Sequence, residues 1–190
     1  ISTLTYLGMG INSLTGEIPE NIGHTLQSIQ TFIVQGNRFG GIIPTSMAKA
    51  RNLQSINLCD NAFHGIVPYF GSLPNLTELN LGKNQLEAGD WTFLHSLTSC
   101  TKLVSLRLDE NNLQGELPKS IGDLPKSLES LILTANKISG TIPHEIGNLS
   151  SLKLLYIEHN LLTGTLPYSL GNLSNMFVLR LSGNKLSGQI

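Results

Sequence analysis

A motif that returns about every 24 residues constrains this 190-residue chain more than any other feature. The segment from Leu53 to Phe63 has the form L-x-x-L-x-L-x-x-N-x-L, and the same pattern recurs along the whole sequence. Its asparagine falls at Asn12, Asn37, Asn61, Asn84, Asn111, Asn136, Asn160 and Asn184, in steps of 25, 24, 23, 27, 25, 24 and 24 residues. Such near-constant spacing indicates about eight copies of one structural unit.

The chemistry of the motif predicts how the copies fold. Positions such as Leu103, Leu106 and Leu108 place apolar side chains inward, and their alternation is that of a short strand. One 24-residue coil cannot bury its apolar side alone, whereas stacked coils share a continuous core. We therefore predict a single leucine-rich-repeat array over residues 1–190. It should be a right-handed α/β repeat solenoid with a parallel concave β-sheet and short or 3₁₀ helices on the convex side.

The asparagine of each repeat ends the strand where the chain turns inward. Its amide carries donors and an acceptor, so it can satisfy backbone groups of adjacent coils that water cannot reach. We predict that the eight asparagines form a structural ladder along the array.

A second signature, L-x-G-x-I-P, follows the asparagine, first as Leu14 to Pro19, and six of the eight prolines occupy this position. Glycine permits a tight bend there, and proline ends the short extended piece that follows. This extension resembles the plant-specific class of leucine-rich repeats over residues 1–190. That class builds the ectodomains of plant receptor-like kinases and receptor-like proteins, and the secreted polygalacturonase-inhibiting proteins.

One repeat is irregular, because Ala88 to Trp91 replaces the G-x-I-P piece within the 27-residue step. We predict that Asp90 caps a helix whose apolar face carries Phe93, Leu97 and Cys100, and that this helix packs like its neighbours. The alternative is a special binding element.

The stretch Leu86 to Cys100 is similar to the grass receptor-kinase subfamily that includes the rice bacterial-blight receptor. In such families a signal peptide precedes the array and a membrane span and kinase follow it. We therefore expect this chain to be a fragment, uncapped at both ends.

Composition excludes several classes of function. Twelve basic against thirteen acidic residues give a net charge of −1, whereas nucleic-acid binders carry a basic excess. No apolar run approaches the 18 or so residues of a membrane span, so we expect no membrane contact by this segment. No catalytic constellation, cofactor motif or metal-ligand spacing is present, so we expect no enzyme activity, cofactor or metal. Cys59 and Cys100 should face different walls of the solenoid and remain unpaired.

The outward positions of the concave strands form the candidate binding surface. Tyrosine and arginine dominate binding hot spots, and both occur here beside acidic residues. Our candidate ligand-binding residues are Arg107, Asp109, Glu110, Tyr156, Glu158, His159 and Arg180. A solvated strand face whose charges only keep it soluble is an equally weighted alternative.

The resemblance implies a function and a location. It implies recognition of a peptide or protein ligand at the extracellular face of the plasma membrane, with a co-receptor kinase, in immunity or development. Three sequons, at Asn75, Asn148 and Asn172, are candidates for N-glycosylation. The same N-L-S/T pattern also arises simply because the repeat requires leucine at its middle position. One alternative is an inhibitor of a cell-wall-degrading enzyme, secreted to the cell wall. Another is an ice-binding protein, which needs flat rows of repeated polar residues, but the outward strand positions of this chain vary from coil to coil.

Overall fold

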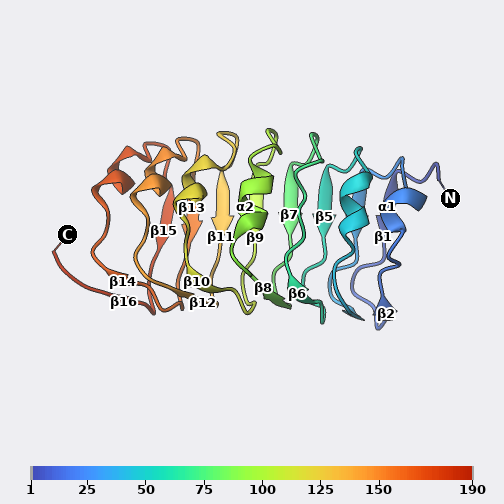
Figure 1. The fold of residues 1–190 in the computed structure, drawn as a ribbon, viewed down its shortest axis with the longest axis horizontal. Coiled ribbons are helices and arrows are strands. Elements are labelled where there is room, and N and C mark those ends of the chain that lie inside the picture. Colours follow the sequence, from blue (N-terminus) through green and yellow to red (C-terminus); the bar gives the residue numbers. More distant parts are fainter. Residues whose placement is uncertain (1, 190) are drawn as a thin grey trace.

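A computed structural model describes residues 2–189 as an elongated array of stacked coils with the two ends far apart (Figure 1). Within this range, eight parallel strands, one from each coil, form a single sheet in chain order. They are β1 (Tyr6–Gly8), β3 (Thr31–Ile33), β5 (Ser55–Asn57), β7 (Glu78–Asn80), β9 (Ser105–Arg107), β11 (Ser130–Ile132), β13 (Leu154–Tyr156) and β15 (Val178–Arg180). The predicted α/β solenoid with a parallel sheet is confirmed.

Each strand is three residues long, and from β3 to β13 its middle residue is buried in the core, whereas the middle residues of the two end strands, Leu7 and Leu179, are partly or largely exposed. In β9 and β11 the paired middle residues Leu106 and Leu131 are fully buried. Because successive side chains of a strand point to opposite faces, the residues before and after each leucine face outward. The register of every strand pair aligns these positions, so the outward residues form columns across the sheet.

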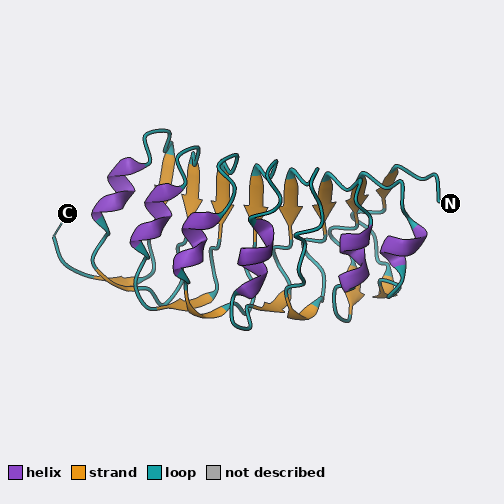
Figure 2. Ribbon diagram, turned by 45° about the horizontal axis from the view of Figure 1, so that its top comes forward, coloured by secondary structure: helices purple, strands orange, loops and turns teal. Residues whose placement is uncertain are grey.

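Short helical segments cover the opposite, convex side of the array (Figure 2). In residues 2–189 they are α1 (Ile22–Thr25), α2 (Thr92–Leu97) and the 3₁₀ segments η1 (Thr45–Lys49), η2 (Lys119–Asp123), η3 (His144–Asn148) and η4 (Tyr168–Asn172). Each 3₁₀ segment directly follows the proline of the repeat, whose missing N–H is not needed at a helix start. The coil that contains β5 has turns in place of a helix. It is the 23-residue coil, and it carries a second proline, Pro74.

A second row of strands, which the sequence did not predict, runs along the edge between the two faces. It comprises β2 (Thr15–Glu17), β4 (Arg38–Gly40), β6 (His64–Ile66), β8 (Gln85–Glu87), β10 (Gln114–Glu116), β12 (Lys137–Ser139), β14 (Thr163–Gly164) and β16 (Lys185–Leu186). They pair in parallel as β2–β4, β6–β8, β10–β12 and β14–β16. The glycine of L-x-G-x-I-P has a positive φ in this row, for example +87° at Gly115 and +73° at Gly140. Side chains other than glycine are strained in that region, which explains the glycine of the motif.

The repeat asparagines join neighbouring coils. The Asn136 amide nitrogen donates to the carbonyl oxygens of Leu108 in the preceding coil and Leu133 in its own, at 2.9 and 3.1 Å. Its Oδ1 accepts a hydrogen bond of 3.0 Å from the N–H of Leu113, again in the preceding coil. The same acceptor bond to the preceding coil is made by Asn37, Asn61, Asn84, Asn111, Asn160 and Asn184. By contrast, the Asn12 amide donates to two carbonyls of its own coil.

The convex segments of adjacent coils approach closely at a glycine. A Cβ built on Gly122 or Gly147 would clash with a backbone carbonyl in the next coil, that of Glu145 or Ser169. Gly171 occupies the same position in its own coil, and a Cβ there would have nothing within 4 Å. Glycine thus avoids a clash at Gly122 and Gly147, where the following coil packs closely against the convex segment.

We predict that Asn136→Ala lowers the free energy of unfolding by about 1–3 kcal/mol, because buried backbone groups in two coils lose their partners. Asn12→Ala is the matched control and should change it little, since Asn12 is exposed and bonds within one coil. Urea denaturation followed by circular dichroism measures both. Equal losses in the two variants would contradict the bridging role.

We also predict that Gly147→Ala destabilises the chain by about 1–3 kcal/mol, since the new methyl group meets the backbone of Ser169. Gly171→Ala should cause no loss. Thermal unfolding of the two variants side by side tests this difference. A Gly147→Ala variant as stable as Gly171→Ala would show that the coils need not pack so closely.

Candidate ligand-binding surface

The concave sheet places one outward column through its centre. From the first coil to the last, this column reads Gly8, Ile33, Asn57, Asn80, Arg107, Ile132, Tyr156 and Arg180. The register of the paired strands sets this order. Eight strands at about 4.8 Å spacing give a surface roughly 34 Å long, enough for an extended peptide.

Four of the candidate residues lie in the last two coils, and three of them form a connected group. The Arg180 guanidinium carbon lies 4.6 Å from the centroid of the Tyr156 ring, within the range of a cation–π contact. The same guanidinium is 3.7 Å from a Glu158 carboxylate oxygen, and the Ser182 hydroxyl donates to Glu158 at 3.0 Å. The arginine is therefore held over the tyrosine ring. Ser182 is a member of this group that sequence reasoning did not single out.

A second charged group lies two coils away. Arg107 Nε is 3.4 Å from Asp109 Oδ1, and Lys83 Nζ is 3.7 Å from Glu110 Oε1. Asp109 is nearly buried, whereas the other three side chains are about half exposed. The Lys83–Glu110 pair is exposed on both sides, and such pairs contribute on the order of 0–1 kcal/mol, so these two charges are free to exchange partners. The coil between the two groups presents Ile132, which is nearly buried, so the structure does not merge them into one cluster.

The rim of the concave face is built from residues with left-handed backbone. The residue before each repeat asparagine has a positive φ, between +52° and +56° at Asp60, Lys83, Glu110, Ala135 and His159. Only two coils have glycine there, so the strain is accepted in the other coils. This conformation was missed in the sequence, because the position carries apolar, acidic and basic side chains alike. His159 is exposed, and its imidazole lies over Gly183 of the next coil.

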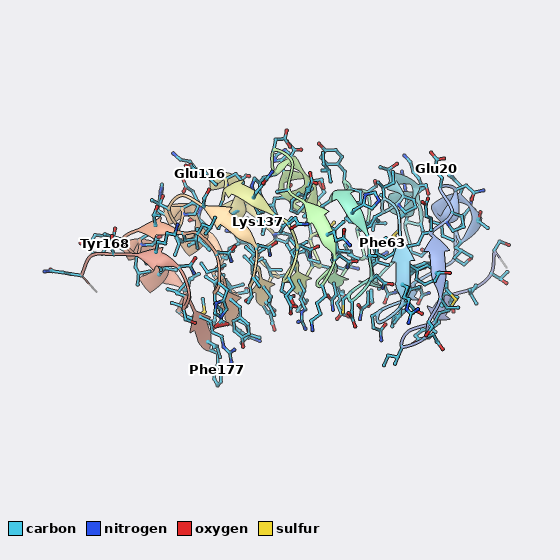
Figure 3. The ribbon with its side chains drawn as sticks, turned by 90° about the horizontal axis from the view of Figure 1, so that it is seen from below. Glu20, Phe63, Glu116, Lys137, Tyr168 and Phe177 are labelled. Carbon is cyan, nitrogen blue, oxygen red and sulfur yellow. The ribbon has the colours of Figure 1, made fainter. Side chains whose placement is uncertain are left out.

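An apolar pocket of about 250 Å³ opens at the other rim of the sheet. Val104, Leu154 and Phe177 line it together with an ion pair of 2.8 Å between Lys153 and Glu129. In Figure 3, Phe177 projects from the side of the array opposite to Glu20 and Glu116. Sequence reasoning missed this pocket, although the outward positions of Val104 and Phe177 could have revealed it.

The irregular coil corrects one prediction. The N-cap of α2 is Trp91, not Asp90, and Trp91 has left-handed backbone with a φ of +65°. Its ring is buried and Nε1 donates to the Gln114 carbonyl at 3.0 Å, so the ring occupies the position over Gly115 that a smaller side chain takes in regular coils. Asp90 still accepts hydrogen bonds from the N–H and the hydroxyl of Thr92, and these bonds lower the pKa of its carboxyl group.

The apolar face of α2 lies where it was predicted. Phe93, Leu97 and Cys100 are all buried, as are Trp91 and Leu94. The helix therefore packs into the core like its neighbours and is not a projecting element.

Both cysteines are free, and they occupy different faces of the coil as predicted. Burial raises the pKa of the Cys100 thiol to about 11, and its Sγ contacts the Phe70 carbonyl. Burial also raises the pKa of the half-exposed Cys59 thiol, with the nearby Asp60 carboxylate adding to the shift. Neither thiol is activated toward nucleophilic chemistry.

Residues 2–189 lack two features that would point to other functions. No group of three or more histidine, cysteine, aspartate or glutamate side chains in this range converges to hold a metal ion. Nor does any helix in the range have the length and apolar character needed to cross a bilayer.

Comparisons with known proteins agree with this geometry. The families described as "Leucine rich repeat", "Leucine Rich repeats (2 copies)" and "Leucine Rich Repeat" match residues 126–186, 51–94 and 102–124. The chain belongs to the leucine-rich-repeat proteins. It is 50% identical over 91 residues to the receptor kinase-like protein Xa21 of rice, Oryza sativa subsp. japonica. That match covers 46% of this chain and 9% of Xa21, so the chain spans a small part of the relative.

Solved receptor structures extend the similarity to nearly the whole chain. The structure of PEPR1 with AtPEP1 is 30% identical, with a TM-score of 0.87 over 98% of this chain and 26% of that one. The Arabidopsis receptor kinase HAESA, in complex with the peptide hormone IDA and the co-receptor SERK1, is also 30% identical. Its TM-score is 0.77 over 100% of this chain and 35% of that one. The fold is therefore that of plant leucine-rich-repeat receptor ectodomains.

The environments of the two thiols predict different reactivity. At pH 8, a disulfide reagent should label Cys59 in the folded protein, whereas Cys100 should react only on unfolding, because it is buried and its raised pKa leaves little thiolate. Absorbance of the released thiol measures both phases, and Cys59→Ser should remove the first. Two thiols reacting at the same rate in the folded chain would contradict the buried placement of Cys100.

Proposed function

We propose that this chain is the extracellular, ligand-recognising part of a plant leucine-rich-repeat receptor-like kinase. Its ligand would be a peptide or protein bound along the concave sheet. The observation that carries the proposal is the pre-arranged group of Tyr156, Arg180 and Glu158, on a surface that carries a second charged group two coils away.

The concave group has the properties of a binding hot spot. Arg180 is held by both an aromatic face and a carboxylate, so little side-chain entropy is lost when a ligand meets it. A carboxylate or backbone carbonyl of a ligand could replace part of the weak contact with Glu158. The Tyr156 ring offers apolar area beside that charge, as an anchor for an extended peptide requires.

The remaining candidate residues extend the surface along the array. Arg107, Asp109, Glu110 and His159 would contact other parts of a ligand that crosses several strands. The charges of Arg107, Asp109 and Glu110 would favour selectivity between ligands more than affinity.

The similarity to HAESA and Xa21 supports the rest of the proposal. The whole protein would lie at the extracellular face of the plasma membrane, and a co-receptor kinase would join it once ligand is bound. Sugar chains on Asn75, Asn148 and Asn172 would be consistent with that location. Asn148 and Asn172 are exposed at the ends of η3 and η4, whereas the Asn75 side chain accepts a hydrogen bond from Lys102 at 2.8 Å.

Peptides selected on the chain from a random display library test the concave site. Tyr156→Ala and Arg180→Ala should each weaken binding of the selected peptides by about tenfold, corresponding to about 1.4 kcal/mol. Fluorescence anisotropy with labelled peptides measures the affinities. The matched controls are Tyr168→Ala and Arg51→Ala, two exposed residues of the same types outside the concave sheet.

Selected peptides that bind both concave variants as tightly as the parent chain would refute the site. If no peptide binds and the chain instead inhibits a polygalacturonase, the secreted inhibitor becomes the better interpretation.

A further inference from the structure

A groove of about 570 Å³ lies on the convex side of the first three coils, away from the concave sheet. Glu20 and His24 line it from the α1 side, Thr45 and Lys49 from η1, and Tyr69 and Ser72 from the coil that contains β5. Its volume falls within the range of small-ligand sites. In Figure 3, Glu20 lies on the side of the molecule opposite to Phe177, which marks the concave edge.

The sequence explains why the groove forms at this place. The η1 segment presents small side chains, with Thr45, Ser46 and Ala48 among the lining residues. On one side stands α1, and on the other the 23-residue coil has turns in place of a helix. Figure 2 shows the wider interval between η1 and α2 that this missing helix leaves on the convex face.

The aromatic ring at the edge of the groove is held in place. Tyr69 is 57% exposed, yet its hydroxyl lies 2.6 Å from the Thr92 hydroxyl. Thr92 in turn donates to the Asp90 carboxylate at 2.6 Å. This chain of hydrogen bonds links the ring to the start of α2, so its exposed area is fixed before any ligand arrives.

The polar groups of the groove are available to a ligand. Within residues 2–189, the side chains of Glu20, His24 and Lys49 have neither an ion-pair partner nor a hydrogen bond. Glu20 supplies an acceptor, Lys49 a donor, and the imidazole of His24 can serve as either. The opposite charges of Glu20 and Lys49 leave the groove without a net preference for anions or cations.

We propose that this convex groove binds a neutral saccharide. A pyranose ring has an apolar face of C–H groups that fits the fixed ring of Tyr69, and its hydroxyls need donors and acceptors close together. Glu20, His24 and Lys49 supply both kinds. The groove is open, so binding is weak, with a dissociation constant on the order of 0.1–1 mM. This activity is independent of peptide binding on the concave sheet.

Titration of the purified chain with neutral oligosaccharides tests the proposal. The probes are the tetrasaccharides of cellulose, xylan, mannan and chitin, followed by saturation-transfer NMR and calorimetry. At least one probe should bind saturably, and Tyr69→Leu should weaken it by about tenfold. Tyr6→Leu is the matched control, since Tyr6 is an equally exposed tyrosine on the concave face, and it should leave saccharide binding unchanged.

A second variant fills the groove without removing the ring. Thr45→Tyr, at an exposed position of η1, should abolish binding while circular dichroism and the melting temperature show that the chain is folded. Absence of binding by all four probes at about 5 mM overturns the proposal. Binding that survives both Tyr69→Leu and Thr45→Tyr overturns it equally.

Discussion

The carboxamide of the repeat asparagine is the interaction on which the rest of the array depends. Each coil ends its strand with carbonyl groups that point inward, where water does not reach them. In seven of the coils between residues 2 and 189, one side chain satisfies a carbonyl of its own coil and a carbonyl or N–H of the preceding one. Asparagine suits this position because its short amide both donates and accepts. The strands are thereby held in one register, and the outward residues line up in columns.

That fixed frame separates the positions that serve the fold from those that serve recognition. Leucine, asparagine and glycine recur where a side chain is buried, bridges two coils or allows a positive φ. The outward strand positions are not restricted by burial, bridging or backbone conformation, so their residue types vary along the array. Arg180 and Tyr156 are paired on neighbouring strands in one part of it, and Asn57 and Asn80 in another. The left-handed residue before each asparagine adds to this freedom, because it directs charged side chains such as Lys83 and Glu110 to the rim.

Periodicity made most of the fold predictable, and it did so for physical reasons. Burial repeats with the coil, so the strand leucines, the asparagine ladder and the order of the concave column follow from counting residues. The paired edge strands such as β2 and β4 were not predictable, because backbone pairing there leaves no apolar alternation. The sequence placed the N-cap of α2 at Asp90, one residue before its actual position at Trp91, because the start of the helix depends on where the Trp91 ring packs in the core.

The concave group of Tyr156, Glu158 and Arg180 and the convex groove also differ in how far the sequence predicts them. The repeat period places Tyr156 and Arg180 on adjacent coils, but the stacking and the contact with Glu158 depend on side-chain conformations that the period does not specify. The convex groove was not predictable at all. It depends on the shortest coil of the array, with its step of 23 residues, on small side chains in η1, and on a hydrogen bond between Tyr69 and Thr92, 23 residues apart.

The asparagine side chains all bond in the same direction along the array, toward the N-terminal neighbour, so the two ends of the array are not equivalent. Every bridging amide reaches from its own coil to the one before it, so each coil is secured by its successor. When one coil opens, the bonds from its asparagine to the preceding coil are lost. The same asparagine can form them again when the coil closes, because its backbone partners stay in place in the preceding coil. Copying or deleting one whole period preserves every such bond, because the side chain and both of its targets shift together. Gain or loss of segments of about 24 residues can therefore lengthen or shorten the array, and with it the recognition surface, without breaking the asparagine bonds.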